Sequence, residues 1–155
     1  PSMRANKFGR IITVSSVAAV VPIPYQAFYS SVKSAVLTYT KALSIELKPY
    51  GVQCCSVLPG DTKTGFTASR KMIKASSDTT SPYYEISQRS VARMEHDEQS
   101  GMPASKIGTV ILRQLRSRKM SITSTPRIDY KAAVSLSGSL PDRFILWVVG
   151  KIYSK

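Results

Sequence analysis

The segment that decides the fold runs from Ser15 to Lys33 and reads SSVAAVVPIPYQAFYSSVK. It joins the end of a short apolar, β-branched run, residues 9–15, to the start of a helix. A loop rich in small residues and proline, residues 17–25, separates the two. Tyr29 and Lys33 are four residues apart, so a helix places them one turn apart on the same face.

The side chains of this segment suit proton exchange with an oxygen atom. An ammonium beside a phenol makes the phenolate easier to form, and such a phenol can exchange a proton with a carbonyl or alcohol oxygen. Ser16, at the carboxyl end of the expected strand, is placed to hold the same oxygen. The alternatives are a packed Tyr29, a solvated Lys33 and a Ser16 that satisfies a backbone group.

A second strand follows the helix. Apolar residues recur every three or four positions over residues 26–48, which predicts one amphipathic helix. Pro49 disfavours helical geometry at Lys48, and Gly51 completes the stop. Residues 52–58 then read as a strand that is buried on both faces, so the pattern predicts a βαβ unit with parallel strands.

At these residues the chain resembles the short-chain dehydrogenase/reductase family. Tyr29-Ser30-Ser31-Val32-Lys33 matches the family's Tyr-x-x-x-Lys motif, and Ser16 stands at the family's spacing of thirteen residues before the Tyr. Pro59-Gly60-Asp61-Thr62-Lys63-Thr64 matches its Pro-Gly-x-x-x-Thr segment. The resemblance implies an α/β fold, a Rossmann-like, doubly wound and mostly parallel sheet, of which this chain supplies the later strands.

The resemblance also implies roles for particular residues. Ser15 is a competing candidate for Ser16, but its spacing to the tyrosine is one residue too long. The implied catalytic residues are Ser16, Tyr29 and Lys33. The implied cofactor contacts are Tyr29, Lys33, Pro59, Gly60, Thr62 and Thr64. The implied substrate contact is Ser16. Tyr25 and Phe28, beside Tyr29 in the sequence, are further candidate substrate contacts, and they, like Pro24, Phe66 and Met72, either line a pocket or only pack.

The expected activity is an NAD(P)-dependent interconversion of an alcohol and a ketone or aldehyde, with Tyr29 as acid and base. The apolar setting of Tyr29 favours a lipophilic substrate, with hydroxysteroid and retinol dehydrogenases as the nearest subgroups. The alternative is a basic module for nucleic acid or anionic lipid with a vestigial reductase motif. NADP is slightly preferred over NAD, although the family makes that choice near its second strand, which is not found here.

The family's Gly-x-x-x-Gly-x-Gly turn does not occur in the sequence, and the family's catalytic Asn is not identifiable. Because such a turn cradles the dinucleotide pyrophosphate, we expect residues 1–155 to be the C-terminal part of one longer reductase domain, to bind dinucleotide poorly and to be inactive alone. Residues 65–104 are expected to form a substrate loop and helical region, and residues 127–155 a C-terminal extension.

Later segments show weaker patterns. Residues 82–99 and 104–118 are predicted to be helical, and residues 120–125 to form a third strand that ends at Pro126. The apolar run at residues 144–149 has basic flanks, so it is either a packed helix or strand or a peripheral membrane contact.

The charge is high, with 22 Lys and Arg against 9 Asp and Glu, a net +13. Such a balance can mark nucleic-acid or lipid binding, but the basic residues are scattered without aromatic interleaving, which favours solvated faces. The adjacent Cys54 and Cys55 point to opposite faces of a strand, so a disulfide between them is not expected. Two reduced thiols favour a cytoplasmic location. Association with a membrane is left open. No spacing around His96 predicts zinc. A homo-oligomer through the helix of Tyr29 is expected from the resemblance.

Overall fold

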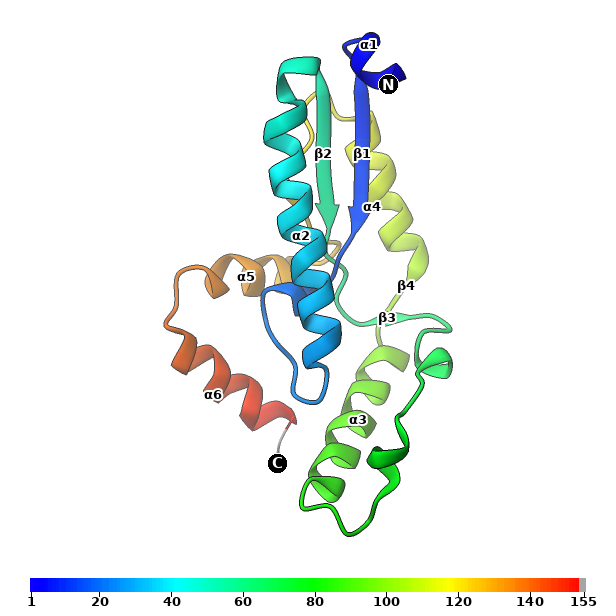
Figure 1. Cartoon of the computed structure of the whole chain (residues 1–155), viewed down its shortest axis with the longest axis vertical. Helices are drawn as coiled ribbons and strands as arrows, with labels where there is room; N and C mark the ends of the chain where they lie inside the picture. The colour runs from blue at the N-terminus through cyan, green and yellow to red at the C-terminus, as the bar shows by residue number, and fades with distance from the viewer. Residues whose placement is uncertain (154–155) are drawn as a thin grey trace.

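A parallel sheet organises the computed structural model, which describes residues 1–153. The strands β1 (Gly9–Val14) and β2 (Val52–Val57) lie side by side (Figure 1), and β5 (Thr123–Ser124) pairs with the other edge of β2, which gives the order β1-β2-β5. The first two pair along their whole length, with Gly9 opposite Val52 and Val14 opposite Val57. The predicted parallel α/β architecture is confirmed.

The crossover between the first two strands is α2 (Ala27–Leu47). A 3₁₀ turn, Lys48–Tyr50, continues it, and Gly51 ends it in the left-handed region at φ +68°. The expected stop at Lys48 was therefore wrong in detail. Lys48 keeps helical geometry (φ −54°, ψ −43°), because Pro49 sits in the first positions of the 3₁₀ turn, where its missing N–H has no partner to lose.

Helices cover both faces of the sheet. The helix α2 buries Leu37 and Thr40 against one face. On the other face, α4 (Ala104–Arg116) packs Val110 against Cys55 in the core cluster. Cys54 and Cys55 are both buried and free, as the alternation of a strand predicts.

The region between β2 and α4 carries the expected loop and helix. A two-stranded parallel ribbon, β3 (Thr62–Lys63) with β4 (Met102–Pro103), closes it at its base. Between these strands lie two 3₁₀ turns, Thr67–Ser69 and Lys74–Ser77, and the helix α3 (Tyr84–Gln99). The ribbon was not predicted, because two-residue strands carry no periodicity.

The third strand is shorter than predicted. Only Thr123–Ser124 pair with β2 in register, although the Ser56 N–H also donates to the Ile122 carbonyl at 2.8 Å. Further helices are α1 (Ser2–Ala5), before β1, and α5 (Ile128–Ser137) and α6 (Asp142–Tyr153), after β5 (Figure 1). No helix in the described part of the chain has the length and apolar character needed to cross a bilayer.

Candidate active site

Ser16 lies directly after β1, at the start of the 3₁₀ turn Val17–Ala19. Its hydroxyl accepts a hydrogen bond from the Ala18 N–H at 3.1 Å. The same hydroxyl donates to the carbonyl of Pro59, just beyond β2, at 3.5 Å. Ser16 therefore stands where the turns after two neighbouring parallel strands meet, the edge of a sheet at which α/β folds bind ligands.

The competing serine is turned away from this edge. The buried Ser15 hydroxyl donates to the Lys33 carbonyl at 2.6 Å, so it points at α2. Its N–H donates to the Val57 carbonyl at 2.8 Å and continues the ladder between the strands. Of the two serines, Ser16 is the one that contacts the Pro59 segment.

Tyr29 and Lys33 lie one turn apart in the first half of α2. The Lys33 ammonium is 5.7 Å from the centroid of the Tyr29 ring. It also donates to the carbonyl of Val14, the last residue of β1, at 3.1 Å. An ammonium has three N–H groups, so a single bond to a backbone carbonyl leaves donors for a ligand oxygen.

An apolar cavity of about 600 Å³ opens beside Tyr29. Its wall comes from the start of α2, from the 3₁₀ region before α3, and from α3 itself. The rings of Tyr29 and Phe66 meet on this wall, with centroids 5.7 Å apart. The aromatic and aliphatic side chains of the wall are Tyr25, Phe28, Tyr29, Phe66, Met72, Ile73, Tyr83, Tyr84 and Val91. Such a cavity accommodates the apolar part of a small molecule.

The cavity includes most of the residues proposed from the sequence to line a pocket. Tyr25, Phe28, Phe66 and Met72 belong to its wall, whereas Ser16 and Pro24 lie outside it. Tyr25 adopts φ +61°, a left-handed conformation that residues with a side chain rarely take. Outliers of this kind concentrate at ligand sites, and this one precedes Tyr29 by four residues.

The cations of the cavity wall differ in their partners. The Arg70 guanidinium forms ion pairs with Glu95 at 3.5 Å and with Glu98 at 2.9 Å, so α3 neutralises it. Lys71 has no ion pair with any residue that the structure describes. The cavity thus offers one positive charge beside a mostly apolar surface.

Two threonine hydroxyls hold the segment after β2, in addition to its pairing with β4. Thr62 donates to the Gly60 carbonyl at 2.8 Å. The exposed Thr64 hydroxyl accepts from the Phe66 N–H at 3.2 Å, and Phe66 in turn contacts Tyr29. The two threonines therefore shape the turn that leads from the sheet edge to the cavity.

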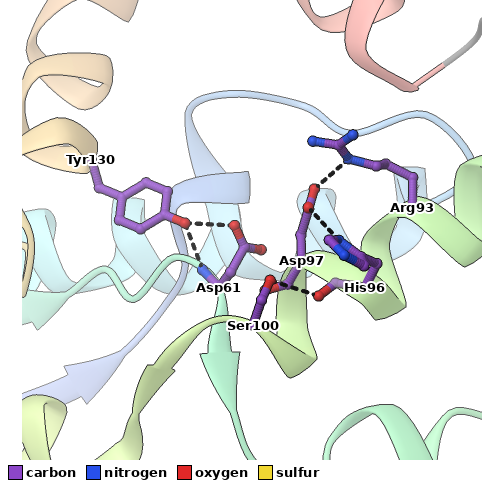
Figure 2. Close-up of polar contacts among 6 residues, drawn as sticks. All are labelled: Asp61, Arg93, His96, Asp97, Ser100 and Tyr130. Atoms are coloured by element: carbon purple, nitrogen blue, oxygen red, sulfur yellow. Dashed lines mark hydrogen bonds and ion pairs between the residues drawn. The ribbon is translucent and has the colours of Figure 1, made fainter.

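Tyr130 of α5 covers this segment (Figure 2). Its phenol donates to the Asp61 carboxylate and accepts from the Asp61 N–H at 3.1 Å. Burial and the nearby carboxylate raise the pKa of Tyr130 above its usual range. A Cβ atom on Gly60 would lie 2.2 Å from the Tyr130 ring, so any other residue there would displace the ring.

Sequence reasoning missed the pair of Asp61 and Tyr130. It gave Asp61 no role, and Tyr130 lies in the C-terminal extension at a place where no helix or strand had been predicted. The two are 69 positions apart, and no local pattern connects such distant residues. Gly60 could have indicated this contact in the sequence, because a glycine next to a strand often marks a site that another group approaches closely.

A second polar cluster on α3 appears in Figure 2. Arg93 pairs with Asp97 at 2.9 Å, and the exposed His96 ring lies 3.4 Å from the same carboxylate. The Ser100 hydroxyl donates to the His96 carbonyl at 2.8 Å. In the described part of the chain, no group of three or more His, Cys, Asp or Glu residues could hold a metal ion. We therefore interpret these contacts as stabilising the C-terminal end of α3.

Comparisons with known proteins agree with the motifs. The short chain dehydrogenase family model matches residues 1–74. A 3-ketodihydrosphingosine reductase from Bacteroides thetaiotaomicron is 38% identical over 156 residues, covering 99% of this chain and 57% of that protein. An NADPH-dependent 1-acyldihydroxyacetone phosphate reductase from Schizosaccharomyces pombe is 41% identical over 56 residues, 36% of this chain and 19% of that protein. The chain thus spans little more than half of the first of these relatives and about a fifth of the second.

Solved structures show the same fold. A short-chain dehydrogenase from Streptomyces avermitilis superposes with a TM-score of 0.66 at 18% identity, over 97% of this chain and 53% of that one. A short chain dehydrogenase/reductase from Burkholderia phymatum, in complex with NAD, gives a TM-score of 0.67 at 22% identity, over 86% and 48%. The expected Rossmann-like fold is confirmed.

Proposed function

This chain belongs to the short-chain dehydrogenase/reductase family, and from that premise we propose that its protein interconverts an alcohol and a ketone or aldehyde with NAD(P). The observation that carries the proposal is the joint placement of Tyr29 and Lys33. The phenol stands at the wall of an apolar cavity, and the ammonium is within one helical turn of it. Proton exchange with a substrate oxygen needs such a group within hydrogen-bond reach.

Each proposed residue has a separate task. Tyr29 donates a proton to the carbonyl oxygen in reduction and takes it back in oxidation. Lys33 places a positive charge near the phenol of Tyr29. The hydrogen bond from Lys33 to the Val14 carbonyl fixes the ammonium against the sheet. Ser16 turns its hydroxyl toward the substrate oxygen when a ligand displaces its 3.5 Å contact with Pro59, which is the longest of its hydrogen bonds.

The proposed cofactor is NAD(P), with NADP slightly preferred. The bound nicotinamide supplies or accepts the hydride. The residues present fit its nicotinamide end, because Lys33 keeps free N–H donors for a ribose hydroxyl and the turn of Pro59, Gly60, Thr62 and Thr64 lies at the ligand-binding edge of the sheet. The name of the Schizosaccharomyces pombe relative states an NADPH dependence, which favours the same choice.

The proposed substrate is lipophilic. The cavity beside Tyr29 is lined mostly by aromatic and aliphatic side chains, with Lys71 as a cation at its wall. The Bacteroides relative, which covers almost the whole chain, is named for the reduction of 3-ketodihydrosphingosine. We therefore propose a ketone carried on a long apolar chain as the substrate class.

We also propose a homo-oligomer through α2. Phe28, Val32 and Tyr39 expose 91%, 61% and 63% of their surface. They follow each other at four and seven residues, so they lie along one face of the helix. An aligned row of exposed apolar residues marks an interaction surface. Replacing Val32 with Glu should turn the oligomer into monomers in sedimentation analysis, whereas an unchanged mass would contradict the proposed interface.

The direct test of the proposed chemistry is Tyr29→Phe in the active protein that carries this chain. We expect turnover to fall by a factor of about 10²–10⁴, because the acid and base group is lost, while the affinity for NADPH changes little. The matched control is Tyr50→Phe, which removes an exposed phenol from the turn that continues the same helix. Turnover that is equal in the two variants would contradict the catalytic role.

A further inference from the structure

A second cavity lies at the opposite end of β2 from Pro59. It has a volume of about 640 Å³ and lies between the second half of α2, the first residues of β2 and the segment that precedes β5. We call it the lysine groove, after Lys41, Lys48 and Lys119, which lie along it. Because it is at the amino end of the strands, it is separate from the edge that carries the candidate active site.

The floor of the lysine groove is apolar and belongs to the core. Val52, Cys54 and Met120 form it, and each is buried. Two aliphatic residues, Ile45 and Ile122, line the same groove and are 74% and 45% exposed. Covering such surface stabilises a complex by roughly 25 cal/mol for each Å² removed from water. The groove therefore favours a ligand with an apolar chain.

The lining of the groove is positively charged. Its three ammonium groups form no ion pair with any residue between 1 and 153, and no acidic residue occurs among the described residues that line it. They add to a chain whose net charge is already +13. A negatively charged group at this lining would meet three cations without competition from a carboxylate.

We infer that the lysine groove binds a single-chain amphiphilic anion, such as an alkyl phosphate or a long-chain carboxylate. The apolar floor takes the chain, and the lysines take the anionic head as point charges. A nucleic acid fits less well, because the groove offers no aromatic side chain on which a base could stack. An uncharged lipid would leave the three ammonium groups unmatched.

The test is titration of the whole protein that carries this chain with monomeric dodecyl phosphate in a calorimeter. We expect saturable binding of one molecule that weakens at least about tenfold when the chain is shortened to octyl phosphate, because four methylene groups are lost. Inorganic phosphate and dodecyltrimethylammonium should not bind. Equal binding of the cationic and anionic amphiphiles, or no binding of dodecyl phosphate, would overturn the inference.

The affinity of lysine variants tests whether the ligand binds in the lysine groove. Lys41→Gln and Lys119→Gln should each weaken the affinity about two- to fivefold, the range of an exposed ion pair. The matched control is Lys106→Gln, an exposed lysine of α4 outside the groove, which should have no effect.

Two further outcomes would also overturn the inference. The first is a loss of affinity in Lys71→Gln but not in the groove variants, which would move the ligand to the cavity beside Tyr29. The second is binding to vesicles of anionic lipid without binding to the monomer, which would identify a membrane surface instead.

Discussion

At the scale of single residues, two of the proposed catalytic side chains are hydrogen-bonded to the carboxyl ends of the two long strands or to the turns that follow them. Lys33 bonds to the end of β1, and Ser16 bridges that strand's turn to Pro59 beyond β2. The spacing of these residues could be predicted from the sequence, because Tyr29 and Lys33 are local to one helix. The contact of Asp61 with Tyr130 could not, since it depends on where α5 packs.

The phenol of Tyr130 should contribute to the stability of the fold. In Tyr130→Phe, the carboxylate and the N–H of Asp61 both lose a partner in a partly buried place. We expect the free energy of unfolding to fall by about 1–3 kcal/mol, measured by urea denaturation. Tyr83→Phe, which removes an exposed phenol, is the control, and equal stabilities of the two variants would contradict this role.

The Tyr130 ring should limit the size of the residue that position 60 can hold. Gly60→Ala places a methyl group within 2.2 Å of that ring, so we expect a loss of about 1–3 kcal/mol. Combining it with Tyr130→Ala should remove most of this additional cost, because neighbouring residues couple. A double-mutant cycle measures the coupling, and additive effects would show that the ring does not limit the site.

At the scale of elements, α2 carries the architecture. Its bounds and those of its two partner strands could be predicted to within one residue, because the helix is long and the strands are apolar runs between turn residues. Its apolar period did not predict the buried face, since Val32 and Tyr39 are 61% and 63% exposed whereas Thr40 is buried. The shorter strands were not predicted correctly, because they contain too few residues to show a pattern. The strand β5 keeps two residues of the six expected, and the paired residues of β3 and β4 are too few to show any period.

The packing of α2 on the sheet can be measured at Leu37, a buried residue of its inner face. Leu37→Ala should lower the free energy of unfolding by about 2–5 kcal/mol, because a cavity remains where the side chain was. Leu112→Ala removes a half-exposed leucine from α4 and should cost clearly less. Similar losses at both sites would mean that α2 is only loosely packed.

At the scale of the whole molecule, the core should respond to alkaline pH through Cys55. Burial raises the pKa of its thiol from 9.0 to about 11. The folded state therefore keeps this proton between pH 9 and 11 while the unfolded state loses it, so the contribution of Cys55 to stability is constant below pH 9 and falls across this window. Unfolding at pH 8.5 and pH 10.5 should show a smaller loss in Cys55→Ala than in the natural chain. The same loss in both would contradict this assignment.

The composition of the whole chain predicted less about its function than the sequence motifs did. The net charge of +13 did not indicate a function by itself, because the sequence does not show which charges have partners. In the structure, Arg70 is neutralised by α3, whereas the lysines of the groove are not. Which cations can bind a ligand depends on tertiary packing.

The most direct measurement follows the hydride itself. The active protein that carries this chain is incubated with a long-chain ketone and NADPH that bears deuterium at both positions of nicotinamide C4, and the rate at which deuterated product forms is followed by mass spectrometry. The proposed function predicts one deuterium on the new carbinol carbon, and a rate about 10²–10⁴-fold lower in Tyr29→Phe, because the acid and base group is lost. A product without deuterium, or equal rates in the two proteins, would contradict it.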